Sequence, residues 1–156
     1  MADDVQLDEP AAELLRVAAD VVPGWLLRLT TGTCASAGVR LDRADRDLVD
    51  RMVDDTTSSL LVALRGLLAS DVDEQRTTPL SLFRAAVAAP TALLDQLGAT
   101  PPPPDPLDGN RFPDDPFGLG PATWSDVDPA LHRPGLVWGA SKAMIVLTRR
   151  RDAGLR

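Results

Sequence analysis

Apolar residues recur every three or four positions along much of this chain, which is the spacing of amphipathic helices. The clearest case lies within residues 42–70, where arginines and aspartates separate the members of one apolar stripe. Asp42 is suited to cap a helix there, and Asp45 falls in its first turn. We predict one long helix over residues 42–70, weakest in propensity at the Thr-Thr-Ser-Ser run of residues 56–59. Its core-facing stripe is Leu48, Val49, Met52, Val53, Leu60, Leu64, Leu67 and Leu68.

The segment before this helix has the same spacing but contains a proline. Asp8 and Pro10 suit a helix start, and the apolar face that follows is interrupted by Pro23 and Gly24. Proline lacks an amide hydrogen and its ring clashes with the preceding turn, so we expect a kink or break there. A second helical piece should then end at Gly38. The apolar face before the proline is made of Leu14, Leu15, Ala18, Val21 and Val22.

Two shorter helical segments follow the long helix. Thr78 before Pro79 is typical of a cap and first helical position, and Phe83 belongs to the next apolar face. Pro90 should interrupt this helix, and Gly98 should end its continuation, because glycine readily adopts a left-handed conformation. The proline-rich residues 99–106 then predict an extended polyproline linker.

Four of the six Phe and Trp residues lie beyond this linker. Prolines and glycines between Phe112 and Trp124 predict an irregular strap, and its rings need shelter from water, so we expect them to press into grooves between helices. Residues 135–151, GLVWGASKAMIVLTRRR, predict a final buried helix. Its three terminal arginines suit the negative end of the helix dipole. The four aromatic residues are Phe112, Phe117, Trp124 and Trp138.

These segments predict an all-α fold: a single helical domain of four to five helices with a C-terminal strap and a buried last helix. The piece beyond the linker has about 50 residues, which is too few to fold alone without a metal or a disulfide. We therefore assign residues 1–7 to a disordered N-terminus, residues 8–151 to one domain with the linker inside it, and residues 152–156 to a flexible tail.

Charge and cysteine content exclude several classes of function. The net charge of −7 argues against a nucleic-acid partner, since such binding rests on clustered Lys and Arg. The single cysteine, Cys34, permits no intrachain disulfide and no Cys-built zinc site, and it suits a reducing cytoplasm. No apolar run is long enough to cross a membrane. The first residues, MADDVQLDEP, lack the basic and apolar regions of a secretory signal, so we expect none. We expect a cytoplasmic protein with no membrane partner.

Candidate chemistry is sparse. Asp126 and Asp128 lie close in sequence to His132, the only histidine, and carboxylates can orient an imidazole as a general base. The same residues suit an ordinary turn and helix cap. Glu74 and Arg76 either bind a ligand or belong to a solvated turn between helices. No calcium-loop spacing and no nucleophile elbow occurs, so we assign no metal, no cofactor and no catalytic residue.

Two hypotheses for function remain open. The first is a non-enzymatic protein-interaction or regulatory factor of unknown partner, with Trp124, Trp138, Phe117 and His132 as its contact patch. The alternative is a small-ligand-binding protein or a hydrolase-type enzyme, with an Asp/His cluster in a pocket between strap and helices. Neither hypothesis fixes an oligomeric state.

The stretches DVDEQRTTPLSLFRAAVAAPT and FPDDPFGLGPATWSDVDPALHRPGLVWGASKA resemble a family of small, uncharacterised actinobacterial proteins. The resemblance covers roughly residues 40–150. It implies a bacterial cytoplasmic setting, and it attaches no activity and no functional residue to this sequence.

Overall fold

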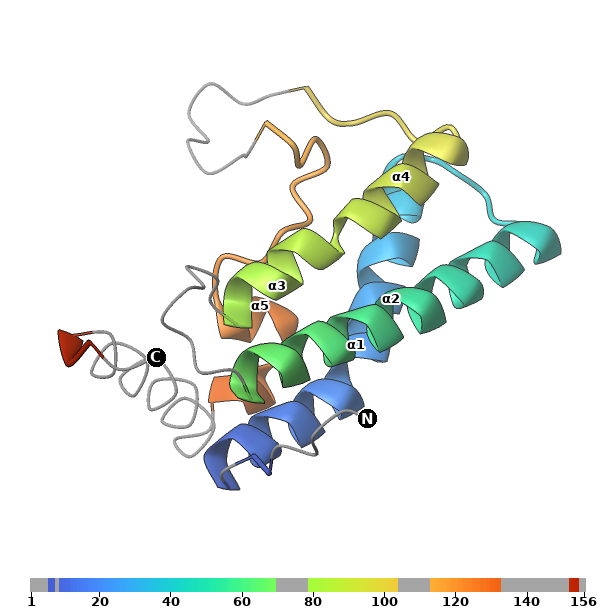
Figure 1. The fold of residues 1–156 in the computed structure, drawn as a ribbon. Coiled ribbons are helices and arrows are strands. Elements are labelled where there is room, and N and C mark those ends of the chain that lie inside the picture. The colour runs from blue at the N-terminus through green and yellow to red at the C-terminus, as the bar shows by residue number, and fades with distance from the viewer. Residues whose placement is uncertain (1–5, 8, 70–78, 104–112, 133–151, 155–156) are drawn as a thin grey trace.

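The computed structural model describes residues 6–7, 9–69, 79–103, 113–132 and 152–154. Its elements are all helical (Figure 1), and no strand occurs within these ranges. The predicted all-α, single-domain fold is therefore confirmed. The predicted last helix over residues 135–151 and the caps at Asp8 and Thr78 lie outside the described residues. In chain order the elements are α1 (Glu9–Ser36), α2 (Arg43–Ala69), α3 (Pro79–Ala86), α4 (Ala88–Gln96), α5 (Trp124–Val127) and a 3-10 helix, η1 (Pro129–His132).

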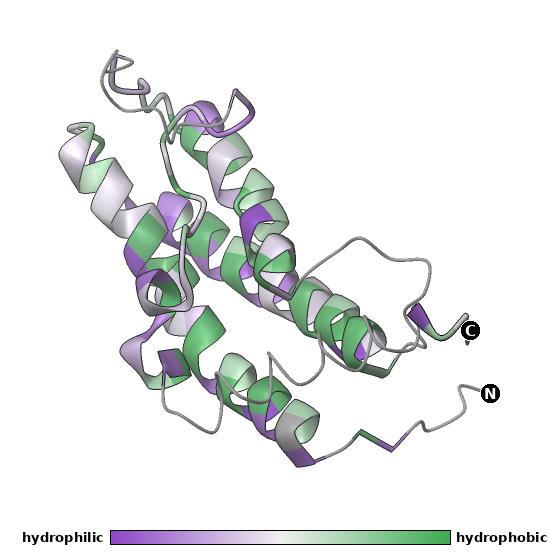
Figure 2. Cartoon of the chain, turned by 90° about the vertical axis from the view of Figure 1, so that its left-hand side faces the viewer, coloured by the Kyte–Doolittle hydropathy of each residue, from purple (hydrophilic) through white to green (hydrophobic). Residues whose placement is uncertain are grey.

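The two long helices, α1 and α2, make the most extensive contact in the described structure. Helices α3 and α4 follow one another along α2, and α4 also contacts α1. Hydrophobic and hydrophilic residues alternate along the helices (Figure 2), as expected when each helix buries one face. Among the described helices, none combines the length and apolar content that a bilayer crossing requires.

Helix α1 runs without a break through Pro23, so the predicted division into two helices is wrong. A proline inside a helix removes one backbone hydrogen bond, and its cost is local. On both sides of Pro23 the helix buries large apolar side chains, including Val22, Trp25 and Leu26. This burial on one continuous face outweighs the lost hydrogen bond. The end of α1 is as predicted: Gly38 has φ +72°, and the Val39 amide donates to the Cys34 carbonyl at 2.9 Å.

Helix α2 confirms the predicted long helix within one residue at each end. The Asp45 amide donates to Asp42 Oδ1 at 2.8 Å, and the Asp42 amide donates to Asp45 Oδ2 at 3.1 Å. This reciprocal pair satisfies two amides that would otherwise be unpaired at the helix start. The Thr-Thr-Ser-Ser run does not interrupt the helix. The buried residues of α2 are Val49, Val53, Thr56, Leu60, Leu64 and Leu67.

The predicted interruption near Pro90 is confirmed, and it falls three residues earlier. Val87 is a turn residue between α3 and α4, which places Pro90 in the first turn of α4. A proline there needs no amide partner, whereas a continuous helix would bring its ring against the carbonyl of Ala86. Gly98 ends α4 with φ +82°, as predicted.

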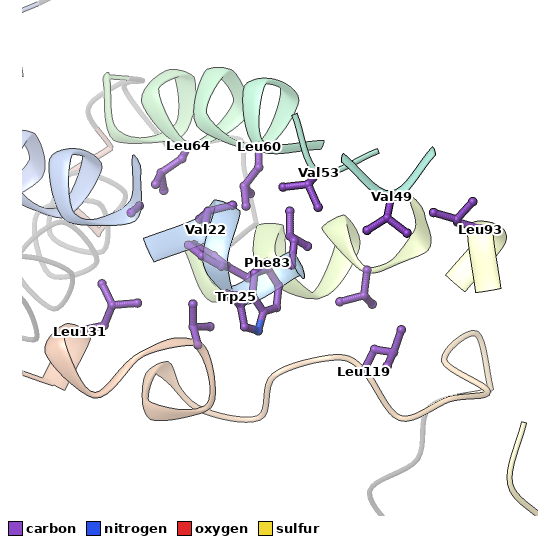
Figure 3. Close-up of a cluster of buried hydrophobic side chains, with 14 of the residues drawn as sticks. Val22, Trp25, Val49, Val53, Leu60, Leu64, Phe83, Leu93, Leu119 and Leu131 are labelled. Carbon is purple, nitrogen blue, oxygen red and sulfur yellow. The ribbon is translucent and has the colours of Figure 1, made fainter. Parts of the chain in front are cut away.

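The described part of the strap, residues 113–132, completes the hydrophobic core. Leu119, Val127 and Leu131 are buried in the same cluster as the helix residues. Figure 3 shows Leu119 and Leu131 on the strap side of this cluster and the α2 residues on the opposite side, with Phe83 and Trp25 between them. The strap is therefore part of the domain's core.

Candidate functional site

Of the eight residues predicted to bind or react, five lie on the described strap. Trp138, Glu74 and Arg76 are outside the described residues. The five are Phe117, Trp124, Asp126, Asp128 and His132, and the structure spreads them over two parts of the strap.

Trp124 and Phe117 both pack against the core and are half-buried. The Trp124 ring meets Phe83 edge-on, with centroids 5.3 Å apart and an interplanar angle of 79°. Phe83 in turn lies 5.7 Å from the Trp25 ring. Such edge-on pairs add to the free energy of burial, because the positive edge of one ring faces the negative face of the other. Trp124 thus joins the strap to α3 and α1.

Asp126 caps the short helix α5. Its Oδ2 accepts hydrogen bonds from the Thr123 amide at 2.8 Å and the Ala122 amide at 2.9 Å. The hydrogen bond from the Thr123 backbone is the main cause that lowers the pKa of this carboxyl. Partial desolvation opposes it, while the Ala122 hydrogen bond and the charge of His132 lower the pKa further. A carboxylate held in this way is a poor proton acceptor at neutral pH.

Asp128 also accepts a hydrogen bond from a nearby backbone amide. Its Oδ1 accepts a hydrogen bond from the Ala130 amide at 2.7 Å, at the turn into η1. His132 is exposed at the end of η1. Because the charge of His132 acts on Asp126, these two exposed residues are neighbours on the surface. The carboxylates of Asp126 and Asp128 both accept hydrogen bonds from backbone amides. Within the part of the chain that the structure describes, no group of three or more His, Cys, Asp or Glu side chains could hold a metal ion.

Cys34 is buried in α1, where burial and then the nearby Asp45 carboxylate raise the pKa of its thiol. The thiolate is the reactive form of cysteine, so this environment opposes nucleophilic chemistry. Cys34 is therefore a small residue of the hydrophobic core.

Sequence reasoning missed the two polar residues that fix the strap. Asp115 is 7% exposed, and its carboxylate accepts hydrogen bonds from the Leu119 amide at 2.8 Å and the Gly120 amide at 2.7 Å. Arg84, on α3, donates from Nε to the Pro121 carbonyl at 2.9 Å and from its terminal nitrogen to the Ala122 carbonyl at 3.3 Å. The order Asp-Pro-Phe-Gly at residues 115–118 is typical of a turn, so the role of Asp115 could have been predicted from sequence. Nothing local marks Arg84.

Two hollows on the described surface could receive a partner. The first, which we call the α2–α3 groove, has a volume of about 470 Å³ and is bordered by small side chains of α2, α3 and α4. Asp55 carries the only charge among the described residues that line it. Representative residues on its two walls are Ser59 and Ala63 of α2, and Leu82, Ala85 and Ala89 of α3 and α4.

The second hollow, which we call the Phe117 pocket, has a volume of about 550 Å³. It lies between the C-terminal half of α1, the proline stretch after α4 and the strap. Arg28 and Gly32 come from α1, Thr100 and Pro102 from the proline stretch, and Phe117 from the strap. The alternative hypothesis from sequence placed an Asp/His cluster in a pocket between strap and helices. Asp126, Asp128 and His132 do not line the Phe117 pocket, and Phe117 itself was assigned to the contact patch.

Comparisons of the chain with known protein families, with curated protein sequences and with solved structures found no match.

Proposed function

We propose that this protein is a non-enzymatic protein-interaction or regulatory factor of the bacterial cytoplasm, and that the α2–α3 groove receives an amphipathic helix of its partner. The single cysteine and the resemblance to small actinobacterial proteins support a location in the bacterial cytoplasm. The carboxylates of Asp115, Asp126 and Asp128 all accept backbone hydrogen bonds, which argues against a catalytic role for them.

The observation that carries this proposal is a groove lined mainly by small apolar side chains, with one exposed valine beside it. Val62 is 74% exposed, the highest value among the large hydrophobic residues that the structure describes. On a helix it shares a face with Asp55, Ser59 and Gly66, at seven, three and four positions from it. Ser59 and Asp55 line the groove, so Val62 extends the α2 wall outward. Val62 thus offers one exposed apolar side chain to a partner at the edge of the groove.

The shape and chemistry of the groove favour a helix as its occupant. Helix α2 and the α3–α4 pair run side by side (Figure 1), and a third helix can lie in the furrow between two others. Ala63, Ala85 and Ala89 let a backbone approach closely, because their side chains are small. The exposed Asp55 carboxylate at the groove favours a Lys or Arg on the partner helix.

Photo-crosslinking from adjacent positions tests this proposal. Ser58 and Ser59 are both exposed, but only Ser59 lines the groove. A benzophenone amino acid placed at Ser59 should crosslink one defined protein in cells, whereas the same group at Ser58, about 100° around the helix, should not. Ala63→Glu should abolish the Ser59 adduct by placing a charge among the apolar contacts. Equal adducts from both positions, or an adduct that survives Ala63→Glu, would contradict the proposal.

A further inference from the structure

The Phe117 pocket combines three chain segments that are distant in sequence, and it lies away from the α2–α3 groove, with which it shares no lining residue. Its volume of about 550 Å³ falls within the range of small-molecule sites, roughly 300–1,000 Å³. Such sites pair a mainly apolar wall with a few polar groups that point into the cavity. The Phe117 pocket has both components.

The polar component is one cation, and two hydroxyl groups line other parts of the same pocket. Among the described residues that line the pocket, Arg28 is the only charged one. Its guanidinium forms no hydrogen bond or ion pair with the described residues, and it lies back over Gly24, where a Cβ would come within 3.1 Å of a terminal nitrogen. Ser36 and Thr100 also line the pocket, with hydroxyls that likewise have no partner among the described residues. The Arg28 guanidinium can bind an anion at its end of the pocket.

The apolar component comes from a ring and from an absent side chain. Phe117 is half-buried, so part of its ring packs on the core and part faces outward. Leu29 and Pro102 add aliphatic surface. Gly32 has no side chain, and a Cβ built on it would meet nothing within 4 Å, which leaves open space above α1 at this point. An apolar body of modest size can therefore lie between Phe117 and α1.

We propose that the Phe117 pocket binds a small amphipathic anion, with its carboxylate at Arg28 and its apolar body between Phe117 and Gly32. This site is independent of the proposed protein contact, because it uses α1 and the strap and leaves the groove free. The net charge of −7 does not attract anions over long distances, so the affinity rests on direct contacts in the pocket.

Titration of the full chain with octanoate, followed by amide NMR shifts, tests the assignment. Saturable shifts should be confined to residues around the pocket, among them Gly32, Thr100 and Phe117. Octan-1-ol, which has the same chain without the charge, should bind about tenfold more weakly, the usual size of a charge-assisted contact on a solvated site. Absence of saturable shifts, or equal affinity for the alcohol, would overturn the proposal.

Three variants assign the two components. Arg28→Gln should lower octanoate affinity about tenfold and leave octan-1-ol binding unchanged. Gly32→Leu should abolish binding of both, because the new side chain enters open space that the ligand needs. Arg46→Gln removes an exposed arginine of α2 that does not line the pocket, and it should bind octanoate like the unaltered chain. Unchanged octanoate binding in both Arg28→Gln and Gly32→Leu would place the ligand elsewhere and overturn the assignment.

Discussion

Helix α2 and the strap at residues 113–132 pack on opposite sides of one hydrophobic core, and different interactions hold them there. Helix α2 contributes a periodic stripe of aliphatic residues, and each turn satisfies its own backbone. The strap has only the four residues of α5 and the four of η1 as regular structure. Its backbone depends on the side chains of Asp115, Asp126, Asp128 and Arg84. The strap is therefore held by a few polar contacts and the Trp124 ring, whereas α2 is held by many similar contacts along its length.

This difference predicts that single substitutions at strap contacts are costly. The largest effect is expected at Phe83, which is fully buried and contacts both the Trp25 and the Trp124 rings. Phe83→Ala should lower the free energy of unfolding by about 3–5 kcal/mol, measured by urea denaturation, because it leaves a cavity where strap and helices meet. Phe83→Leu, which keeps most of the volume, should lose less than half of that. Similar losses for the two variants would mean that the cavity is not the cause.

A smaller loss is expected at Asp115. Asp115→Ala would leave the buried Leu119 amide and the Gly120 amide without their acceptor, so we predict a loss of roughly 2–3 kcal/mol in urea denaturation. Asp45→Ala serves as the matched control in α2, where the capping contact is exposed and the cost should be about 1 kcal/mol. If Asp45→Ala cost more than Asp115→Ala, the strap would not depend on its polar contacts in the way described.

The next largest loss of stability is expected on substitution of Arg84. Its two hydrogen bonds to strap carbonyls are partly exposed to solvent, so Arg84→Ala should cost about 1–2 kcal/mol. Arg84→Lys should recover little, since an ammonium group cannot reproduce the fork of the guanidinium. Thermal unfolding of the three proteins under one buffer condition checks this order. Full recovery by Arg84→Lys would indicate that charge, and not geometry, is what matters at this position.

The smallest effect is a pH dependence that arises from Asp126. Its pKa is lowered in the folded chain, so its carboxylate stabilises the fold above its unfolded pKa of about 3.9, and this contribution is lost as pH falls through the lower folded value. Urea denaturation at pH 6 and at pH 3 should show a narrower gap between the unaltered chain and Asp126→Asn at the lower pH. A gap that is constant with pH would exclude this linkage.

The helices could be predicted from sequence because their signals are local. The stripe of α2, the Asp42–Asp45 cap and the glycine ends at Gly38 and Gly98 all depend on residues within a few positions of one another. Pro23 misled the prediction because burial along the rest of α1 outweighs one lost hydrogen bond, and burial is a property of the whole fold.

The sites were harder to predict, because their parts come together only in the folded chain. Arg84 contacts Pro121 across 37 positions, and no spacing rule connects them. The Phe117 pocket joins Arg28, Thr100 and Phe117 in the same way. The aspartates near His132 were visible in sequence as a possible base or as turn residues. Their hydrogen bonds to backbone amides favour the second interpretation.

The central claim is that the strap is held on the helices as part of their core, and native-state amide hydrogen exchange tests it most directly. The Leu119, Gly120 and Leu131 amides donate to strap acceptors, and the Leu119 and Leu131 side chains are buried in the core. We predict that these three amides exchange at least about a hundredfold more slowly than in an unstructured peptide. Exchange at the unstructured rate, while the amides of α2 remain protected, would contradict the claim.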